Sequence, residues 1–97
     1  PDNLFKDLTK LTILNLSNNL IKQLSKTLFE KLNVLKILDL NKNRIEYLDR
    51  FIFKNLTNLE ELDLSQNQIS FIEMNAFENL NYLEILRLNS NNFDQIE

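Results

Sequence analysis

The stretch LTILNLSNNLIKQL, residues 11–24, decides the fold of this chain. Leu14 and Leu16 alternate with polar residues as in a half-buried strand, and the alternation ends at the polar run SNN. Similar stretches follow at a spacing of 24 residues, and the residues that take the place of Asn19 in them are Asn43, Asn67 and Asn91. A spacing this regular predicts stacked copies of one structural unit.

Three full copies, a truncated copy and the tail of another fill the chain, in the ranges 11–34, 35–58, 59–82, 83–97 and 1–10 respectively. Leucine occupies the first, fourth and sixth positions of every copy, and Phe and Leu occupy the nineteenth and twenty-second. One copy cannot bury its apolar face alone, whereas stacked copies share a continuous core. We therefore predict a single repeat domain over residues 1–97, with parallel strands on one side and a return side closed by the Phe column.

The asparagine at the ninth position is predicted to be structural. Where the chain leaves the strand, its backbone N–H and C=O groups turn inward and lose water, and an amide offers both donors and an acceptor to them. Stacked side chains would form a ladder made of Asn19, Asn43, Asn67 and Asn91.

The pattern LxxLxLxxNxLxxLxxxxFxxLxx resembles the leucine-rich repeat, in the 24-residue form typical of Toll-like receptor ectodomains and small leucine-rich proteoglycans. The resemblance covers essentially all 97 residues. It implies an α/β solenoid of about four repeats shaped as a horseshoe arc. The parallel sheet would line the concave face, and the convex side would be mostly irregular or short 3-10 helix.

The resemblance departs from the family at both ends. Extracellular members usually carry cysteine-rich caps, and this chain has no cysteine. Both ends also fall inside a copy, so we expect the chain to be a fragment of a longer array. The alternative is a small complete protein, which would need self-association through its uncapped ends or an unusually tolerant end.

Composition excludes several kinds of chemistry. Because the chain lacks His, Cys and Gly, it has no His-based triad, thiolate metal site or phosphate-cradling glycine loop. The net charge is −3 and no basic cluster appears in the sequence, so we expect no nucleic acid or membrane contact. Paired carboxylates on an open strand face lack the enclosing pocket that catalysis needs. We expect no enzyme, no cofactor and no metal.

The outward positions of the strands are the candidate binding surface, because repeat solenoids usually bind partners on this side. The predicted partner-binding residues are Ile13, Asn15, Ile37, Asp39, Lys42, Glu61, Asp63, Gln66, Ile85 and Arg87.

Two properties of this surface bear on its partner. Its isoleucines form a broken aliphatic stripe, which is either a docking surface or the ordinary preference of strands for β-branched residues. Asp39, Glu61 and Asp63 form an acidic centre that favours a basic protein partner, although a solvated acidic face also costs little in water. We expect Arg87, one strand further along, to offset the charge of Asp63.

Aromatic residues and glycosylation motifs give further expectations. Tyr47 and Phe71 hold equivalent positions after the asparagine turn, where they form either an aromatic binding spot or packing between copies. Phe51 stands isolated on the return side. Asn15 and Asn55 each begin an N-glycosylation motif.

We therefore predict a protein-recognition module from the ectodomain of a Toll-like or related cell-surface receptor, which binds a protein ligand or co-receptor. Two alternatives remain open. One is a secreted matrix or adhesion protein of the proteoglycan type, and the other is a cytoplasmic leucine-rich repeat scaffold.

Overall fold

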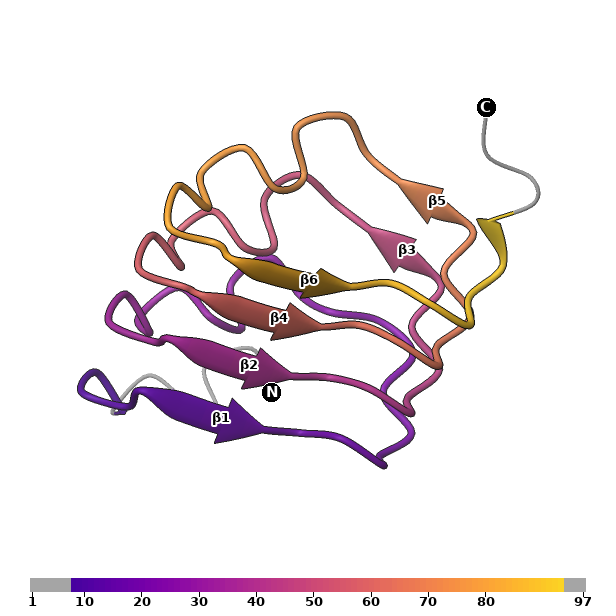
Figure 1. The fold of residues 1–97 in the computed structure, drawn as a ribbon, viewed down its shortest axis with the longest axis horizontal. Coiled ribbons are helices and arrows are strands. Elements are labelled where there is room, and N and C mark those ends of the chain that lie inside the picture. The colour runs from indigo at the N-terminus through magenta and orange to yellow at the C-terminus, as the bar shows by residue number, and fades with distance from the viewer. Residues whose placement is uncertain (1–7, 94–97) are drawn as a thin grey trace.

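The computed structural model describes residues 8–93, so Phe5 of the predicted Phe column and Ile96, an apolar residue of the truncated copy, lie outside the described residues. Figure 1 shows the short strands of the main sheet side by side, with the return segments of the chain behind them. They form a parallel sheet in the order β1 (Ile13–Asn15), β2 (Ile37–Asp39), β4 (Glu61–Asp63) and β6 (Ile85–Arg87). A second parallel sheet pairs β3 (Tyr47–Leu48) with β5 (Phe71–Ile72), after the turn that leaves each larger strand.

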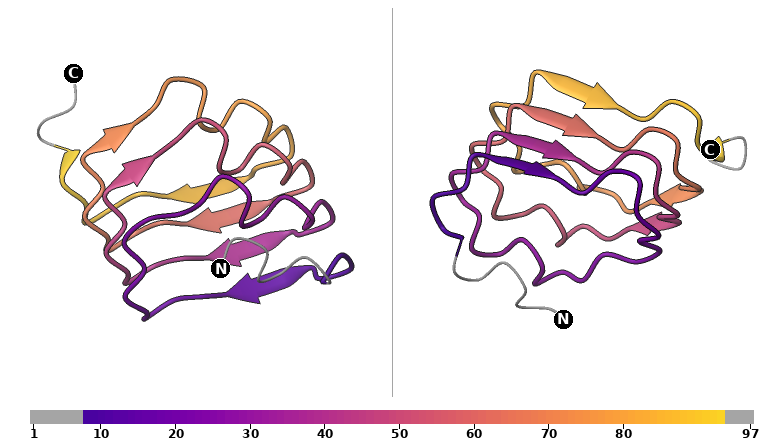
Figure 2. Two further views of the ribbon diagram at one scale, coloured as in Figure 1. Left: turned by 180° about the vertical axis from the view of Figure 1, so that it is seen from behind. Right: turned by 90° about the horizontal axis from the view of Figure 1, so that it is seen from below.

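The register of the main sheet follows the 24-residue spacing without a slip. Leu14 of β1 pairs with Leu38 of β2, and Leu38 pairs in turn with Leu62 of β4. Leu62 then pairs with Leu86 of β6. Seen from below, the strands lie on one side of the molecule and the return segments on the other (Figure 2). Every equivalent position is therefore stacked in a row along the solenoid.

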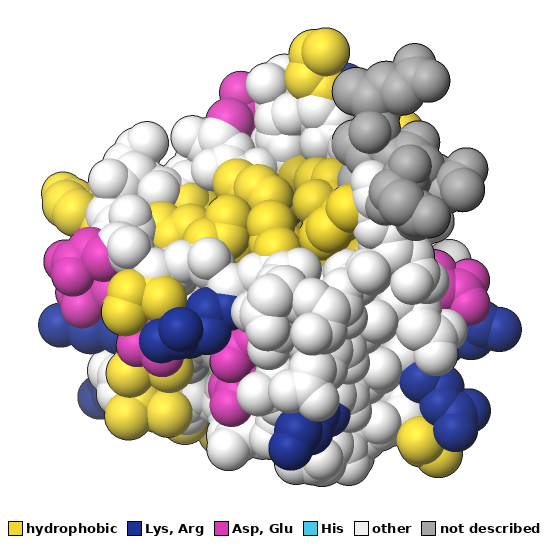
Figure 3. Space-filling view, turned by 45° about the vertical axis from the view of Figure 1, so that its right-hand side comes forward, with side chains coloured by type: hydrophobic (Ala, Val, Ile, Leu, Met, Phe, Trp, Pro, Cys, Tyr) yellow, Lys and Arg dark blue, Asp and Glu magenta, His cyan; other side chains and the backbone are white. Residues whose placement is uncertain are grey.

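The core lies between the two sides. Leu38 and Leu62 are completely buried, and they pack with leucines of the return side in one hydrophobic cluster. Phe53 stacks between Phe29 and Phe77, with ring centroids 6.3 and 6.0 Å away, so the predicted Phe column is continuous through three copies. Leu86 is 38% exposed, because no described strand covers the outer edge of β6. Figure 3 shows hydrophobic side chains gathered in a patch beside the grey residues, at the height of β5 and β6 in Figure 1.

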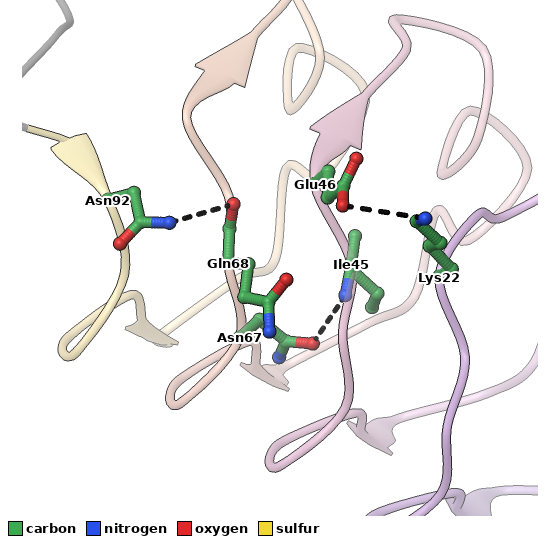
Figure 4. Close-up of polar contacts among 6 residues, drawn as sticks. All are labelled: Lys22, Ile45, Glu46, Asn67, Gln68 and Asn92. Atoms are coloured by element: carbon green, nitrogen blue, oxygen red, sulfur yellow. Dashed lines mark hydrogen bonds and ion pairs between the residues drawn. The ribbon is translucent and has the colours of Figure 1, made fainter.

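The ninth-position asparagines connect the copies through their side chains. The Nδ2 group of Asn67 donates to the carbonyls of Leu64 and Ser65 in its own copy and to Leu40 of the preceding copy, at 3.0–3.1 Å. Its Oδ1 atom accepts the N–H of Ile45 at 3.0 Å (Figure 4). Asn67 is buried, so water cannot replace it as the hydrogen-bond partner of these backbone groups.

The same bonds recur at two other rungs. Asn43 donates to Leu16 and accepts from Ile21, and Asn91 donates to Leu64 and accepts from Ile69. At the first rung, Asn19 is exposed, and among residues 8–93 its side chain bonds only to carbonyls of its own copy.

The residue before each of these asparagines has a left-handed backbone. Asn18, Lys42, Gln66 and Ser90 have φ angles of 55–62°, although the chain contains no glycine to adopt them without strain. A left-handed residue with a Cβ atom costs roughly 1–2 kcal/mol. The conformation is held because it turns the carbonyl groups toward the asparagine that follows, so the ladder offsets the strain.

Replacing Asn67 with Ala should lower the free energy of unfolding by about 3 kcal/mol, the upper end of the cost of one buried unpaired group, because several groups lose their partner together. Asn19→Ala is the matched control. It removes two exposed bonds and should cost about 0.5–1 kcal/mol. Urea unfolding followed by circular dichroism measures both values, and equal losses would show that the ladder does not join the copies.

Candidate protein-binding surface

The outward side of β1, β2, β4 and β6, called here the sheet face, carries two rows of side chains fixed by the register. One row runs through the third position of each copy: Ile13, Ile37, Glu61 and Ile85. The other runs through the fifth position: Asn15, Asp39, Asp63 and Arg87. Eight of the ten predicted partner-binding residues are therefore brought together on one face.

The remaining two residues extend the sheet face beyond the strand ends. Lys42 and Gln66 are exposed in equivalent left-handed positions of neighbouring loops. The N–H of Lys42 donates to the carbonyl of Ser65, one residue before Gln66, at 3.1 Å. The two loops therefore run side by side, in step with the strands that lead into them.

The fifth-position side chains also have a local structural role that the sequence pattern did not reveal. Asp39 Oδ1 accepts the N–H of Asn41 at 3.0 Å, and Asp63 Oδ1 accepts both the N–H and the hydroxyl of Ser65, at 3.0 and 2.6 Å. Asn15 accepts the N–H of Ser17 in the same way at 2.9 Å. The acceptor two residues before the bend, which favours an Asx-type turn, was the sequence signal for this role.

The acidic centre stays together, but Arg87 does not form an ion pair with it. Arg87 pairs with Asp63 in the register, yet the single ion pair within 4.0 Å among residues 8–93 joins Lys22 to Glu46 (Figure 4). Asp63 instead accepts a hydrogen bond from the amide of Asn41 at 3.3 Å. Arg87 is therefore a neighbour of Asp63 in the register without a direct contact, and the expected offset of charge stays a prediction.

The aromatic residues of the small sheet form one spot. The rings of Tyr47 and Phe71 are stacked, with centroids 5.4 Å apart and planes inclined by 6°, and both side chains are exposed. Partial burial, then the carboxylates of Glu73 and Asp49, raise the pKa of the Tyr47 phenol above its usual value of 10.0. The pair joins two copies and also presents a flat aromatic surface.

The two glycosylation motifs differ in whether the side-chain amide nitrogen of the asparagine takes part in a hydrogen bond. Asn15 is exposed on the sheet face, and its Oδ1 atom is the one that bonds. The Nδ2 group of Asn55, which would carry a glycan, donates to the carbonyl of Glu30 in the preceding copy at 3.2 Å. Asn15 is thus the more accessible acceptor.

Residues 8–93 contain no group of three or more His, Cys, Asp or Glu side chains placed to hold a metal ion. None of the described segments is a helix long and apolar enough to cross a membrane.

The family model for the leucine rich repeat matches residues 1–45 and 34–93. This chain belongs to the leucine-rich repeat family. The fold is typically a binding scaffold without catalytic activity, so the family assigns the chain a role as a protein-interaction module. No curated protein matches the sequence.

Solved structures agree with the family assignment. A structure of the Toll–Spatzle complex, described as a molecular hub in Drosophila development and innate immunity, superposes with a TM-score of 0.92 at 35% identity over 94% of this chain. The leucine-rich repeat domain of APL1B gives 0.90 at 28% identity over 94% of the chain. TLR13 in its complex with ssRNA13 gives 0.90 at 30% identity over all of it. The chain spans 12%, 27% and 15% of those three chains.

The raised pKa of Tyr47 gives a prediction for alkaline pH. Because the folded state holds the phenol proton more tightly than the unfolded state, this stabilisation is complete below pH 10 and is lost as the pH rises through the folded pKa. The stability advantage of the natural protein over Tyr47→Phe should therefore shrink as the pH rises from below 10 through the folded pKa. Urea unfolding across this range measures it, with Tyr82→Phe as the control for a phenol outside the aromatic pair. Parallel curves for Tyr47→Phe and the natural protein would contradict the assignment.

Proposed function

We propose that this chain forms part of the ectodomain of a Toll-like or related cell-surface receptor and binds a protein ligand or co-receptor through its sheet face. The observation that supports this proposal most is the continuous register of the sheet face in a chain that resembles Toll at 35% identity. Parallel rows of outward side chains offer a partner a continuous surface. The loops after the strands, which lie side by side at equivalent positions, extend this surface.

The charge of the sheet face favours a basic partner. Asp39 and Asp63 are neighbours in the register, and Glu61 lies on the same strand as Asp63. Like charges on facing strand positions destabilise a sheet slightly, and a cationic partner would remove that cost. Electrostatic complementarity of this kind sets orientation and association rate more than affinity.

Isoleucines on either side of the acidic centre would supply apolar contact. Ile13 and Ile37 are neighbours in the register, and Ile85 lies beyond Glu61. Apolar anchors surrounded by polar groups are the usual composition of a protein interface.

Photo-crosslinking in the protein produced in its own cells tests the proposal and does not require the partner to be identified first. A benzophenone amino acid at Ile37, on the sheet face, should give one discrete protein adduct. The same group at the exposed Glu78, on the return side, should give none. Equal adducts from both positions, or none from Ile37, would contradict binding at the sheet face.

A charge variant tests the acidic centre in the same assay. The triple change Asp39→Asn, Glu61→Gln and Asp63→Asn should lower the adduct yield at Ile37 severalfold and flatten its dependence on salt. Asparagine keeps the Oδ1 acceptor that the turns need, as Asn15 does in the first copy. A matched control neutralises three carboxylates away from the sheet face, at Glu30, Glu46 and Glu78. If the control lowers the yield as much as the triple change, the acidic centre has no specific role.

Glycan occupancy separates the cell-surface and secreted alternatives from a cytoplasmic scaffold. Enzymatic release of N-glycans from the native protein converts an occupied asparagine to aspartate, so peptide mapping should find Asp at position 15. A glycan on Asn15 would take the β1 end of the sheet face and leave β2 and β4, with the acidic centre, to the partner. The variant Ser17→Ala removes the motif and should abolish the conversion, while the N–H of residue 17 can still bond to Asn15. A native protein with unmodified Asn15 and Asn55 in the cytosol would contradict the proposed location.

A further inference from the structure

The return side carries a basic pocket that the sequence does not show as a cluster. Lys26, Thr27, Glu30, Phe51 and Lys54 line a cavity of about 230 Å³ between the first and second copies. Arg50 lies over the Phe51 ring, with its Cζ atom 4.9 Å from the centroid. The Nζ atoms of Lys26 and Lys54 are each 5.7 Å from the same centroid. Phe51, which stands isolated in the sequence, is therefore surrounded by three cations.

The repeat explains why the cations converge. Lys26 and Arg50 both occupy the sixteenth position of their copies, and stacking brings equivalent positions together. Lys54 lies one turn further along the return segment. In the third copy the corresponding positions hold Met74 and Glu78, so this combination occurs once in residues 8–93.

The charges in the pocket are not paired within the protein. Any two of the three cationic groups lie within about 11 Å of each other, roughly one Debye length at 0.1 M salt, so they repel. Glu30 lines the pocket but is within 4.0 Å of none of them, since the single ion pair among residues 8–93 is elsewhere. An exposed contact with the face of an aromatic ring returns only about 0.5–1 kcal/mol per cation.

Two other carboxylates nearby accept hydrogen bonds from backbone N–H groups. Asp49 accepts the N–H of Phe51 at 2.6 Å, and Glu73 accepts the N–H of Arg50 at 2.9 Å. These bonds fix the segment that carries the ring and the guanidinium group, and neither carboxylate lines the pocket. Lys26 and Lys54 thus line the cavity with one carboxylate between the two copies, and Arg50 lies over the Phe51 ring beside them.

We propose that this pocket binds a sulfate or phosphate group of a ligand that is distinct from the partner of the sheet face. A tetrahedral oxyanion accepts hydrogen bonds in several directions at once, which suits the two ammonium groups that line the pocket from neighbouring copies, with the Arg50 guanidinium group close by. The cavity is smaller than the roughly 300–1,000 Å³ typical of sites that enclose a drug-sized molecule, so it accommodates the charged group and the part next to it. The exposed ring of Phe51 offers that part an apolar contact.

Titration with inorganic sulfate and inorganic phosphate, followed by NMR at constant ionic strength, tests the site directly. Saturable shifts should appear at the backbone amides of Thr27 and Phe51 and at the side chains of Lys26, Arg50 and Lys54. Lys26→Gln or Lys54→Gln should each weaken binding about fivefold, as expected for one lost charge-assisted contact. Lys36→Gln, which removes an exposed cation elsewhere, should leave the affinity within about twofold.

The source of the oxyanion is distinguished by matched sugars. Glucose 6-sulfate and glucose 6-phosphate carry the two groups on one scaffold, and glucose is the uncharged control. Phosphate affinity should rise between about pH 5.5 and 7.5 as the second proton leaves near pH 6, whereas sulfate affinity should not. Tighter binding of one sugar over the other assigns the pocket to that group. Shifts that do not saturate, or that fall equally in Lys36→Gln, would overturn the proposal.

Discussion

The chain leaves each strand through a bend that takes backbone carbonyl groups out of water, and one amide side chain per copy satisfies them. At Asn67, one carboxamide bonds three carbonyl groups and one N–H, drawn from two copies. The rungs at Asn43, Asn67 and Asn91 each reach a carbonyl group of the preceding copy, so these bends are fully bonded only when neighbouring copies are in register. The ladder therefore couples the local turn to the stacking of the whole solenoid.

That coupling determines what the surface can be. A register without slips places every fifth-position side chain beside its equivalents, and on the return side it does the same for Lys26 and Arg50. Residues separated by 24 positions in sequence thus become neighbours, and each copy contributes one residue to each row of the surface. The fold leaves these outward residues free to vary, so the partner depends on their chemistry and not on the scaffold.

The 24-residue repeat was enough to predict the parallel sheet, its strand order and the stacked Phe column. Each of these features depends on one residue type, Leu or Phe, that recurs at this fixed period. The rows of the sheet face were also predictable, since period-two alternation assigns Ile37 and Asp39 to the side opposite Leu38. The hydrogen bonds of Asp39 and Asp63 to the loop were not, because a carboxylate before a bend is compatible with both turn formation and ligand binding. The basic pocket was not predicted, because its residues are dispersed in the sequence. They form no local run of positive charge that would have indicated a site.

Native-state hydrogen exchange of the Ile45 amide tests the central role of the ladder most directly. This N–H lies in a loop outside the regular sheets, and its partner is the side chain of Asn67 in the next copy. If the ladder joins the copies, the Ile45 amide exchanges only through global unfolding, with a free energy of opening equal to that of the core strands. Exchange near the rate of an unprotected loop amide would contradict this account.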